Sequence, residues 1–120
     1  MAKLRLASEA EGDIETALAF SLQTFGAAAH RRYEVLISTA LKDIAADPNR
    51  AGSVNRAEFG PGVRSFHLSI SRKRAAKLAG AVRAPRHVLF YRQLEGEIVE
   101  VIRMLYDAMD FARHLPHGGD

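Results

Sequence analysis

At 120 residues the chain is long enough for one domain to bury most of its apolar side chains, so we expect a single domain over residues 1–120. It has no cysteine, no apolar run of transmembrane length and a charged N-terminus, which excludes disulfides, thiolate metal sites, membrane spans and a signal peptide and indicates a cytoplasmic protein. The net charge of +3 is uneven, because every charged residue between Glu58 and Glu95 is a cation; this indicates a polyanionic or acidic partner, unless these cations only keep the protein in solution.

The N-terminal part of the sequence predicts a short strand and two helices. Lys3–Leu6 alternates as a strand does, and Ser8, followed by two acids, is typical of a helix start. The first helix should end at Gly26, and a second should run over about residues 27–46, because Pro48 pushes the residue before it out of helical geometry. Two amphipathic helices joined at a glycine predict an antiparallel helical hairpin. The buried stripe of the first helix is expected to contain Ile14, Leu18, Leu22 and Phe25.

The middle of the chain predicts a connection, a strand and a basic insert. Residues 49–62 are punctuated by glycine and proline, as connections are, and Val63–Ile70 alternates like a strand with one buried face. Residues 71–85 show neither alternation nor an apolar stripe. They form either two turns of basic helix, capped by Ser71 and ended by Gly80, or a mobile loop.

Two apolar runs rich in β-branched and aromatic residues follow the insert. Val88–Tyr91 and Ile98–Leu105 flank a polar break that contains Gly96, which predicts an antiparallel hairpin. The second run has apolar side chains on both faces, so we expect a central strand that is covered on both sides. The last turn of the chain is expected to be anchored on the domain by Met109, Phe111 and Leu115.

Few polar residues point to chemistry by themselves. Arg103 interrupts the last strand, and because a buried arginine is costly without a partner, we expect it to reach the sheet surface or to pair with a nearby acid. The candidate acids are Glu100, Asp107 and Asp110. The five histidines are scattered, and the two that are closest, His114 and His117, are separated by Pro116, so we expect neither a metal site nor a cofactor.

Residues 86–115 resemble the C-terminal half of ParE-like toxins, from the ParE/RelE superfamily of toxin–antitoxin systems. The resemblance consists of a strand, a hairpin turn, a strand of aliphatic residues around Arg103, then Met109-Asp110 and the basic ending Arg113-His114-Leu115. The N-terminal residues 4–14 and 23–26 are also similar, so the resemblance covers about residues 3–116. It implies an α+β fold, in which an N-terminal helical hairpin packs on a small antiparallel sheet and a short helix ends the chain, with 116–120 as a tail.

The resemblance implies a toxin that inhibits DNA gyrase, blocks replication, and is neutralised by a cognate antitoxin, with no membrane partner. Residues expected to contact the target, with possible contact to DNA through the basic insert, are Arg72, Lys73, Arg74, Lys77, Arg83, Arg103, Arg113 and His114. Residues expected to contact the antitoxin, along the helical hairpin and the sheet edge, are Ile14, Leu18, Tyr33, Tyr91, Phe111 and Leu115.

The alternative is a ribosome-dependent endoribonuclease of the RelE type. Cleavage of RNA by its own 2′-hydroxyl needs a base, an acid and fixed cations, and the candidates are His87, Tyr106 and Arg83. Two acids just beyond the last strand, Asp107 and Asp110, argue against this reading because they would repel a phosphate backbone. A gyrase inhibitor of the ParE type needs no catalytic residues.

Overall fold

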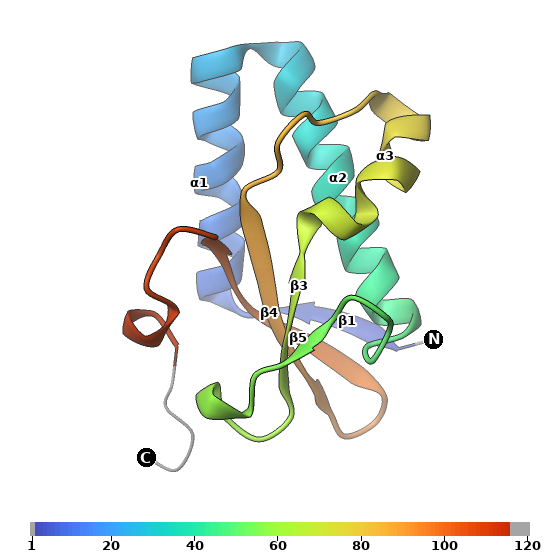
Figure 1. Cartoon of the computed structure of the whole chain (residues 1–120), viewed down its shortest axis with the longest axis vertical. Coiled ribbons are helices and arrows are strands. Elements are labelled where there is room, and N and C mark those ends of the chain that lie inside the picture. The colour runs from blue at the N-terminus through green and yellow to red at the C-terminus, as the bar shows by residue number, and fades with distance from the viewer. Residues whose placement is uncertain (1, 116–120) are drawn as a thin grey trace.

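The computed structural model describes residues 2–115, which form three α-helices, a five-stranded sheet and three short 3₁₀ turns (Figure 1). The helices are α1 (Ser8–Phe25), α2 (Ala27–Ala46) and α3 (Arg72–Ala79). The strands are β1 (Lys3–Leu6), β2 (Val54–Asn55), β3 (Val63–His67), β4 (His87–Leu94) and β5 (Ile98–Tyr106). The 3₁₀ turns span Ala57–Phe59, Leu68–Ser71 and Phe111–Arg113.

The strands are ordered β1-β5-β4-β3-β2 in the sheet. The predicted hairpin is β4–β5, and its antiparallel pairing runs from Leu94 opposite Ile98 to His87 opposite Tyr106, with a register shift between Phe90 and Tyr91 that leaves Ile102 of β5 without a partner. β1 pairs with β5 in parallel, whereas all other pairs are antiparallel. The α+β fold class is therefore confirmed, with the refinement that the sheet is mixed.

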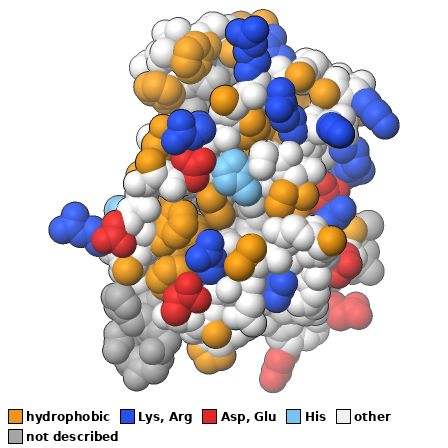
Figure 2. Space-filling view, in the orientation of Figure 1, with side chains coloured by type: hydrophobic (Ala, Val, Ile, Leu, Met, Phe, Trp, Pro, Cys, Tyr) orange, Lys and Arg blue, Asp and Glu red, His pale blue; other side chains and the backbone are white. Residues whose placement is uncertain are grey.

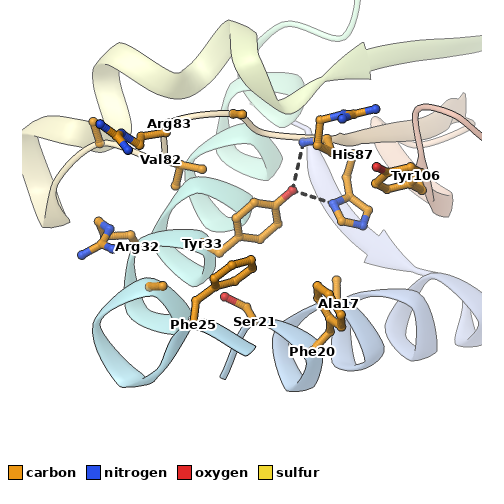
Figure 3. Close-up of a pocket in the computed structure, with 14 residues that line it drawn as sticks. Ala17, Phe20, Ser21, Phe25, Arg32, Tyr33, Val82, Arg83, His87 and Tyr106 are labelled. Atoms are coloured by element: carbon orange, nitrogen blue, oxygen red, sulfur yellow. Dashed lines mark hydrogen bonds between the residues drawn. The ribbon is translucent and has the colours of Figure 1, made fainter. Parts of the chain in front are cut away.

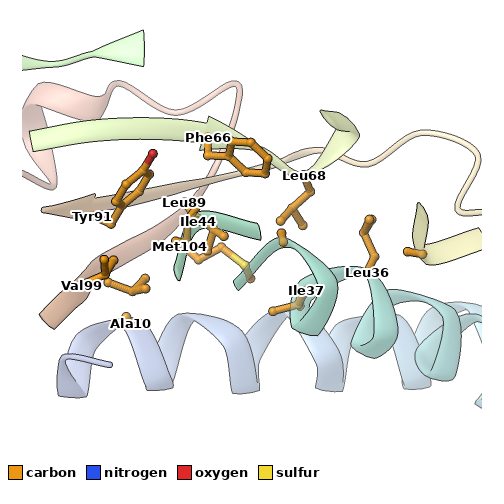
Figure 4. Packing of buried hydrophobic residues seen from close by; sticks show 13 residues of the cluster. Ala10, Leu36, Ile37, Ile44, Phe66, Leu68, Leu89, Tyr91, Val99 and Met104 are labelled. Atoms are coloured by element: carbon orange, nitrogen blue, oxygen red, sulfur yellow. The ribbon is translucent and has the colours of Figure 1, made fainter. Parts of the chain in front are cut away.

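The helical hairpin covers one face of the sheet and makes the main core with it (Figures 1 and 4). Leu36 and Ile44 of α2 are fully buried there, together with Phe66 of β3 and Tyr91 of β4. The Tyr91 hydroxyl donates a hydrogen bond to the Pro48 carbonyl oxygen (2.6 Å), so the one polar atom of this side chain is satisfied.

The opposite face of the sheet carries a second, smaller cluster. Phe90 of β4 packs against Phe59 and Phe111 in edge-to-face geometry, with ring centroids 6.1 and 4.9 Å apart. Leu115 is buried in the same cluster, so Phe111 and Leu115 hold the end of the chain against the sheet as predicted. Met109 does not, because its side chain is exposed. β5 is thus a central strand covered on both faces.

Three local predictions at element ends were wrong. The strand predicted over 63–70 ends at His67, because the chain turns into a 3₁₀ helix that buries Leu68 and exposes Ile70. Ser8 is the first helical residue of α1 and does not cap it; the N-cap is Ala7. Ser71 does precede α3, and Gly80 ends it with φ of +95°, but the Ser71 hydroxyl bonds to Asp43 and not to the helix backbone.

The predicted buried stripe of α1 holds only in the first half of the helix. Ile14 and Leu18 are half-buried against the core, whereas Leu22 and Phe25 are exposed. The reason is that the two helices extend beyond the strands before they meet at Gly26 (Figure 1), so no sheet lies beneath the tip of the hairpin. Within residues 2–115, no helix is both long and apolar enough to cross a membrane.

Candidate functional site

A groove of about 620 Å³ lies at the tip of the helical hairpin (Figure 3). One wall comes from the end of α1 and the start of α2, and the other from the segment between α3 and β4 and from the end of β5. The helical wall contributes Ala17, Phe20, Ser21, Phe25, Ala29, Arg32 and Tyr33. The opposite wall contributes Ala81, Val82, Arg83, Ala84, Arg86, His87 and Tyr106.

Two phenylalanines on the helical wall are exposed. The side chains of Phe20 and Phe25 are 61% and 67% exposed, and their rings pack edge-to-face with centroids 6.2 Å apart. A phenylalanine side chain gains about 1.5–3 kcal/mol when it is moved from water into an apolar environment. Because exposed apolar patches are often interaction sites, these two rings make the groove a candidate binding surface.

The groove is rimmed by cations. Its lining contains Arg32, Arg83 and Arg86 and no carboxylate. Arg86 is paired with Asp107, whereas Arg32 and Arg83 form no ion pair with any residue in 2–115. An occupant that matches this lining has apolar side chains for the floor and acidic side chains for the rim.

Tyr33 and His87 form a polar contact at the inner end of the groove (Figure 3). The Tyr33 hydroxyl oxygen lies 2.5 Å from His87 Nδ1 and accepts a hydrogen bond from the Arg86 backbone N–H (3.4 Å). Burial lowers the pKa of His87 and raises the pKa of Tyr33 to about 12, so both groups are neutral at pH 7.

Asp107 connects three segments beside this contact. Its carboxylate pairs with the Arg86 guanidinium (2.9 Å) and accepts a hydrogen bond from His67 Nε2 (3.0 Å), while its backbone N–H donates to the Arg86 carbonyl oxygen (2.8 Å). Arg86 and His67 hold the pKa of the Asp107 carboxyl below its ordinary value. The Arg86 guanidinium also stacks over the Tyr106 ring at 4.9 Å. These contacts fix the wall of the groove that is formed by β4 and β5.

The residues predicted from the sequence fall into different places. The ribonuclease candidates His87, Tyr106 and Arg83 all line the groove. Of the predicted target contacts, Arg72, Lys73 and Lys77 are exposed on α3, and Arg113 and His114 are exposed near the end of the chain. These two groups lie on different parts of the molecule, so the structure does not bring the predicted target contacts together. Their role in target binding stays a prediction.

Two arginines in that set have partners that the sequence analysis did not identify. Arg74 pairs with the buried Asp43. Arg103 forms two hydrogen bonds to Asp13 of α1, at 2.8 and 2.9 Å, so the predicted pairing with Glu100, Asp107 or Asp110 was wrong. Asp13 is 90 residues away in the sequence, and the first turns of α1 bring it to the edge of β5 where β1 has ended. Arg103 is held by this pair and is not a free cation.

The residues predicted to contact the antitoxin also lie in different parts of the structure. Tyr33 lines the groove. Ile14, Leu18 and Phe111 are half-buried against the two clusters. Tyr91 and Leu115 are buried in the cores and present little surface to a partner. Antitoxin binding by these residues stays a prediction, with Tyr33 the best placed.

Two groove residues, Phe20 and Arg32, were not predicted from the sequence. One signal was present: Phe20 lies off the Ile14–Leu18 stripe, so a large aromatic side chain on α1 was left without a place in the core. Nothing in the sequence pointed to Arg32, because it belongs to the groove only through the way residues 81–87 pack opposite the helical hairpin. Among residues 2–115, no cluster of His, Cys, Asp and Glu could hold a metal ion.

Comparison with known proteins points to one family. The family model described as the ParE toxin of the type II toxin–antitoxin system parDE matches residues 4–111, which is most of the chain. A solved chain of the chromosomal ParDE toxin–antitoxin system from P. aeruginosa is similar in structure, with a TM-score of 0.61 and 16% sequence identity. That alignment covers 88% of this chain and 96% of the other, and at this identity it shows the fold alone. No curated protein is similar enough in sequence to count as a relative.

Proposed function

Because the chain belongs to the ParE toxin family of type II toxin–antitoxin systems, we propose that it inhibits DNA gyrase in the cytoplasm and is neutralised by a cognate antitoxin bound in the groove. The observation that carries the antitoxin part is the groove itself. Its exposed Phe20 and Phe25 suit the apolar side of an amphipathic segment, and Arg32 and Arg83, which have no ion-pair partner among the described residues, suit its acidic side. Such segments are commonly disordered until they bind and fold against a preformed surface.

Truncation of the two exposed phenylalanines tests this part of the proposal. In the variant Phe20→Ala/Phe25→Ala we expect the antitoxin to bind about 100-fold more weakly, because both side chains would be buried only in the complex. The stability of the free toxin should change by less than about 0.5 kcal/mol, because both side chains are exposed without the partner. Calorimetric titration with the antitoxin encoded beside this chain measures the first quantity, and urea unfolding the second.

Leu78→Ala is the matched control. This side chain is 72% exposed and lies on α3, outside the groove lining. It should bind the antitoxin like the wild type. If the double phenylalanine variant also binds like the wild type, the antitoxin does not occupy the groove.

A second function, RNA cleavage, is favoured by one observation. The three candidate catalytic residues line the same groove: Arg83 and His87 come from the segment that leads into β4, and Tyr106 comes from the end of β5. Two features count against it. His87 Nδ1 is already bonded to Tyr33, and the Asp107 carboxylate neutralises Arg86 at the place where an RNA phosphate would need a cation.

Pulse-labelling after induction of this chain alone in a bacterium distinguishes the two functions. A gyrase inhibitor should lower DNA synthesis within minutes while protein synthesis continues. An early fall in protein synthesis would reject gyrase as the target and favour the ribonuclease. In that case a His87→Gln/Tyr106→Phe variant should lose most of its activity, whereas a gyrase inhibitor should retain it.

A further inference from the structure

A basic surface on α3 lies apart from the floor of the groove. At 3.6 residues per turn, Lys73 and Lys77 lie about 160° and 200° around the helix from Ala75, which is buried against α2. Both lysines therefore point directly away from the protein, and Arg72 is exposed beside them. Figure 2 shows Lys and Arg side chains gathered over the part of the molecule where α2 and α3 lie.

Among residues 2–115, Arg72, Lys73 and Lys77 form no ion pair, and the chain has no acidic residue between Glu58 and Glu95. Arg74 does have a partner, Asp43 of α2, which also accepts a hydrogen bond from Ser71 (2.6 Å). Because these contacts fasten α3 to α2, the free cations are carried on a fixed helix and not on a loop.

The surface continues toward the groove. Arg83 lies in the segment between α3 and β4. Arg32 of α2 lies against Gly80 at the end of α3, so that a methyl group added to this glycine would be 3.2 Å from Arg32 Cδ. Arg32 and Arg83 form no ion pair within residues 2–115 either. Five cations without an ion pair in the described part of the chain therefore lie on α3, on the segment that follows it and on the neighbouring α2: Arg32, Arg72, Lys73, Lys77 and Arg83.

The composition of this surface favours nucleic acid over protein as the partner. The centres of protein interfaces are depleted in lysine and built on aromatic anchors, whereas α3 has two outward lysines and no aromatic residue. Contacts to the DNA backbone come mainly from lysine and arginine. We propose that the α3 surface binds the phosphate backbone of duplex DNA independently of base sequence. This goes beyond the proposed function and does not depend on it.

Fluorescence anisotropy with a labelled duplex of about 20 base pairs, titrated with the full-length chain, tests the proposal. With about five phosphates neutralised, one for each cation of the surface, the logarithm of the binding constant should fall with the logarithm of the salt concentration with a slope of about −4.5. In Lys73→Gln/Lys77→Gln the slope should decrease in magnitude by about 2, and the affinity at low salt should fall about tenfold.

The matched control is Lys3→Gln/Arg113→Gln, which removes the same amount of charge. Lys3 is in β1 and Arg113 is in the 3₁₀ turn near the end of the chain, away from α3 (Figure 1), and neither forms an ion pair within residues 2–115. This variant should bind within about twofold of the wild type. Equal losses of DNA affinity in both variants would mean that net charge alone attracts DNA, which would overturn the proposal. Absence of DNA binding by the wild type at low salt would also overturn it. If the α3 variant loses gyrase or antitoxin binding while the wild type binds no DNA, the surface is a protein interface.

Discussion

Replacing Asp13 with alanine should lower the free energy of unfolding by about 3 kcal/mol, because it removes the partner of a poorly exposed arginine and of a backbone N–H. The side chains of Asp13 and Arg103 are each 17% exposed. Besides its two hydrogen bonds to Arg103, the Asp13 carboxylate accepts the backbone N–H of Met104 at 2.9 Å. The pairing of β1 with β5 ends at Val101. Beyond this point, Asp13 takes the place of β1 as the hydrogen-bond acceptor for the Met104 N–H of β5.

Urea unfolding checks this result, and Glu9→Gln is the control. Glu9 also contacts Arg103, at 3.4 Å, but its side chain is 74% exposed, so its loss should cost less than about 0.5 kcal/mol. A double-mutant cycle of Asp13→Ala with Arg103→Leu should give a coupling of at least about 1 kcal/mol. A coupling near zero would show that the cost of Asp13→Ala comes from Met104 alone.

The Asp13–Arg103 pair could be predicted from the sequence only in part. A charged residue in an apolar strand predicts that a partner exists, since an unpaired buried charge is too costly. Which partner it is depends on the packing of α1 across the sheet, and neighbours in sequence such as Asp107 were the wrong choice. Asp107 is instead held by Arg86 and His67. Alternation and helical periodicity carry no information on contacts of this range.

By contrast, features set by local chemistry were easier to predict. The β4–β5 hairpin follows from two β-branched runs around Gly96. Residues 71–85 were left open between a helix and a mobile loop; the structure has the helix, with the bounds that Ser71 and Gly80 predict, although the capping role of Ser71 was wrong. The groove was not predicted, because it forms where the helical hairpin extends beyond the ends of the strands. From helical periodicity alone, Leu22 and Phe25 were predicted to be core residues. They are exposed because the strands are too short to lie beneath this part of the helices.

Replacing Asp43 with alanine should release α3 from α2 and cost about 2–3 kcal/mol. Asp43 is 6% exposed and accepts the hydroxyl of Ser71, which is itself buried, so the substitution leaves that hydroxyl without a partner. It also frees Arg74 and one contact of Arg50 at 3.6 Å. Asp43→Asn should cost less, because the amide oxygen can still accept from Ser71. Urea unfolding measures these costs.

Hydrogen exchange locates the effect. Because the lost contacts all fasten α3 and the loop after α2, amides of Arg72–Ala79 should exchange faster in Asp43→Ala while those of β4 and β5 change little beyond the global loss. Asp47→Ala, at the exposed end of the same helix, is the control and should leave α3 unchanged. If exchange in α3 stays at the wild-type rate, Asp43 does not hold the helix. If the α3 amides of Asp43→Ala exchange faster and the variant also binds DNA more weakly, the Asp43 carboxylate holds the basic surface in the orientation that binds DNA.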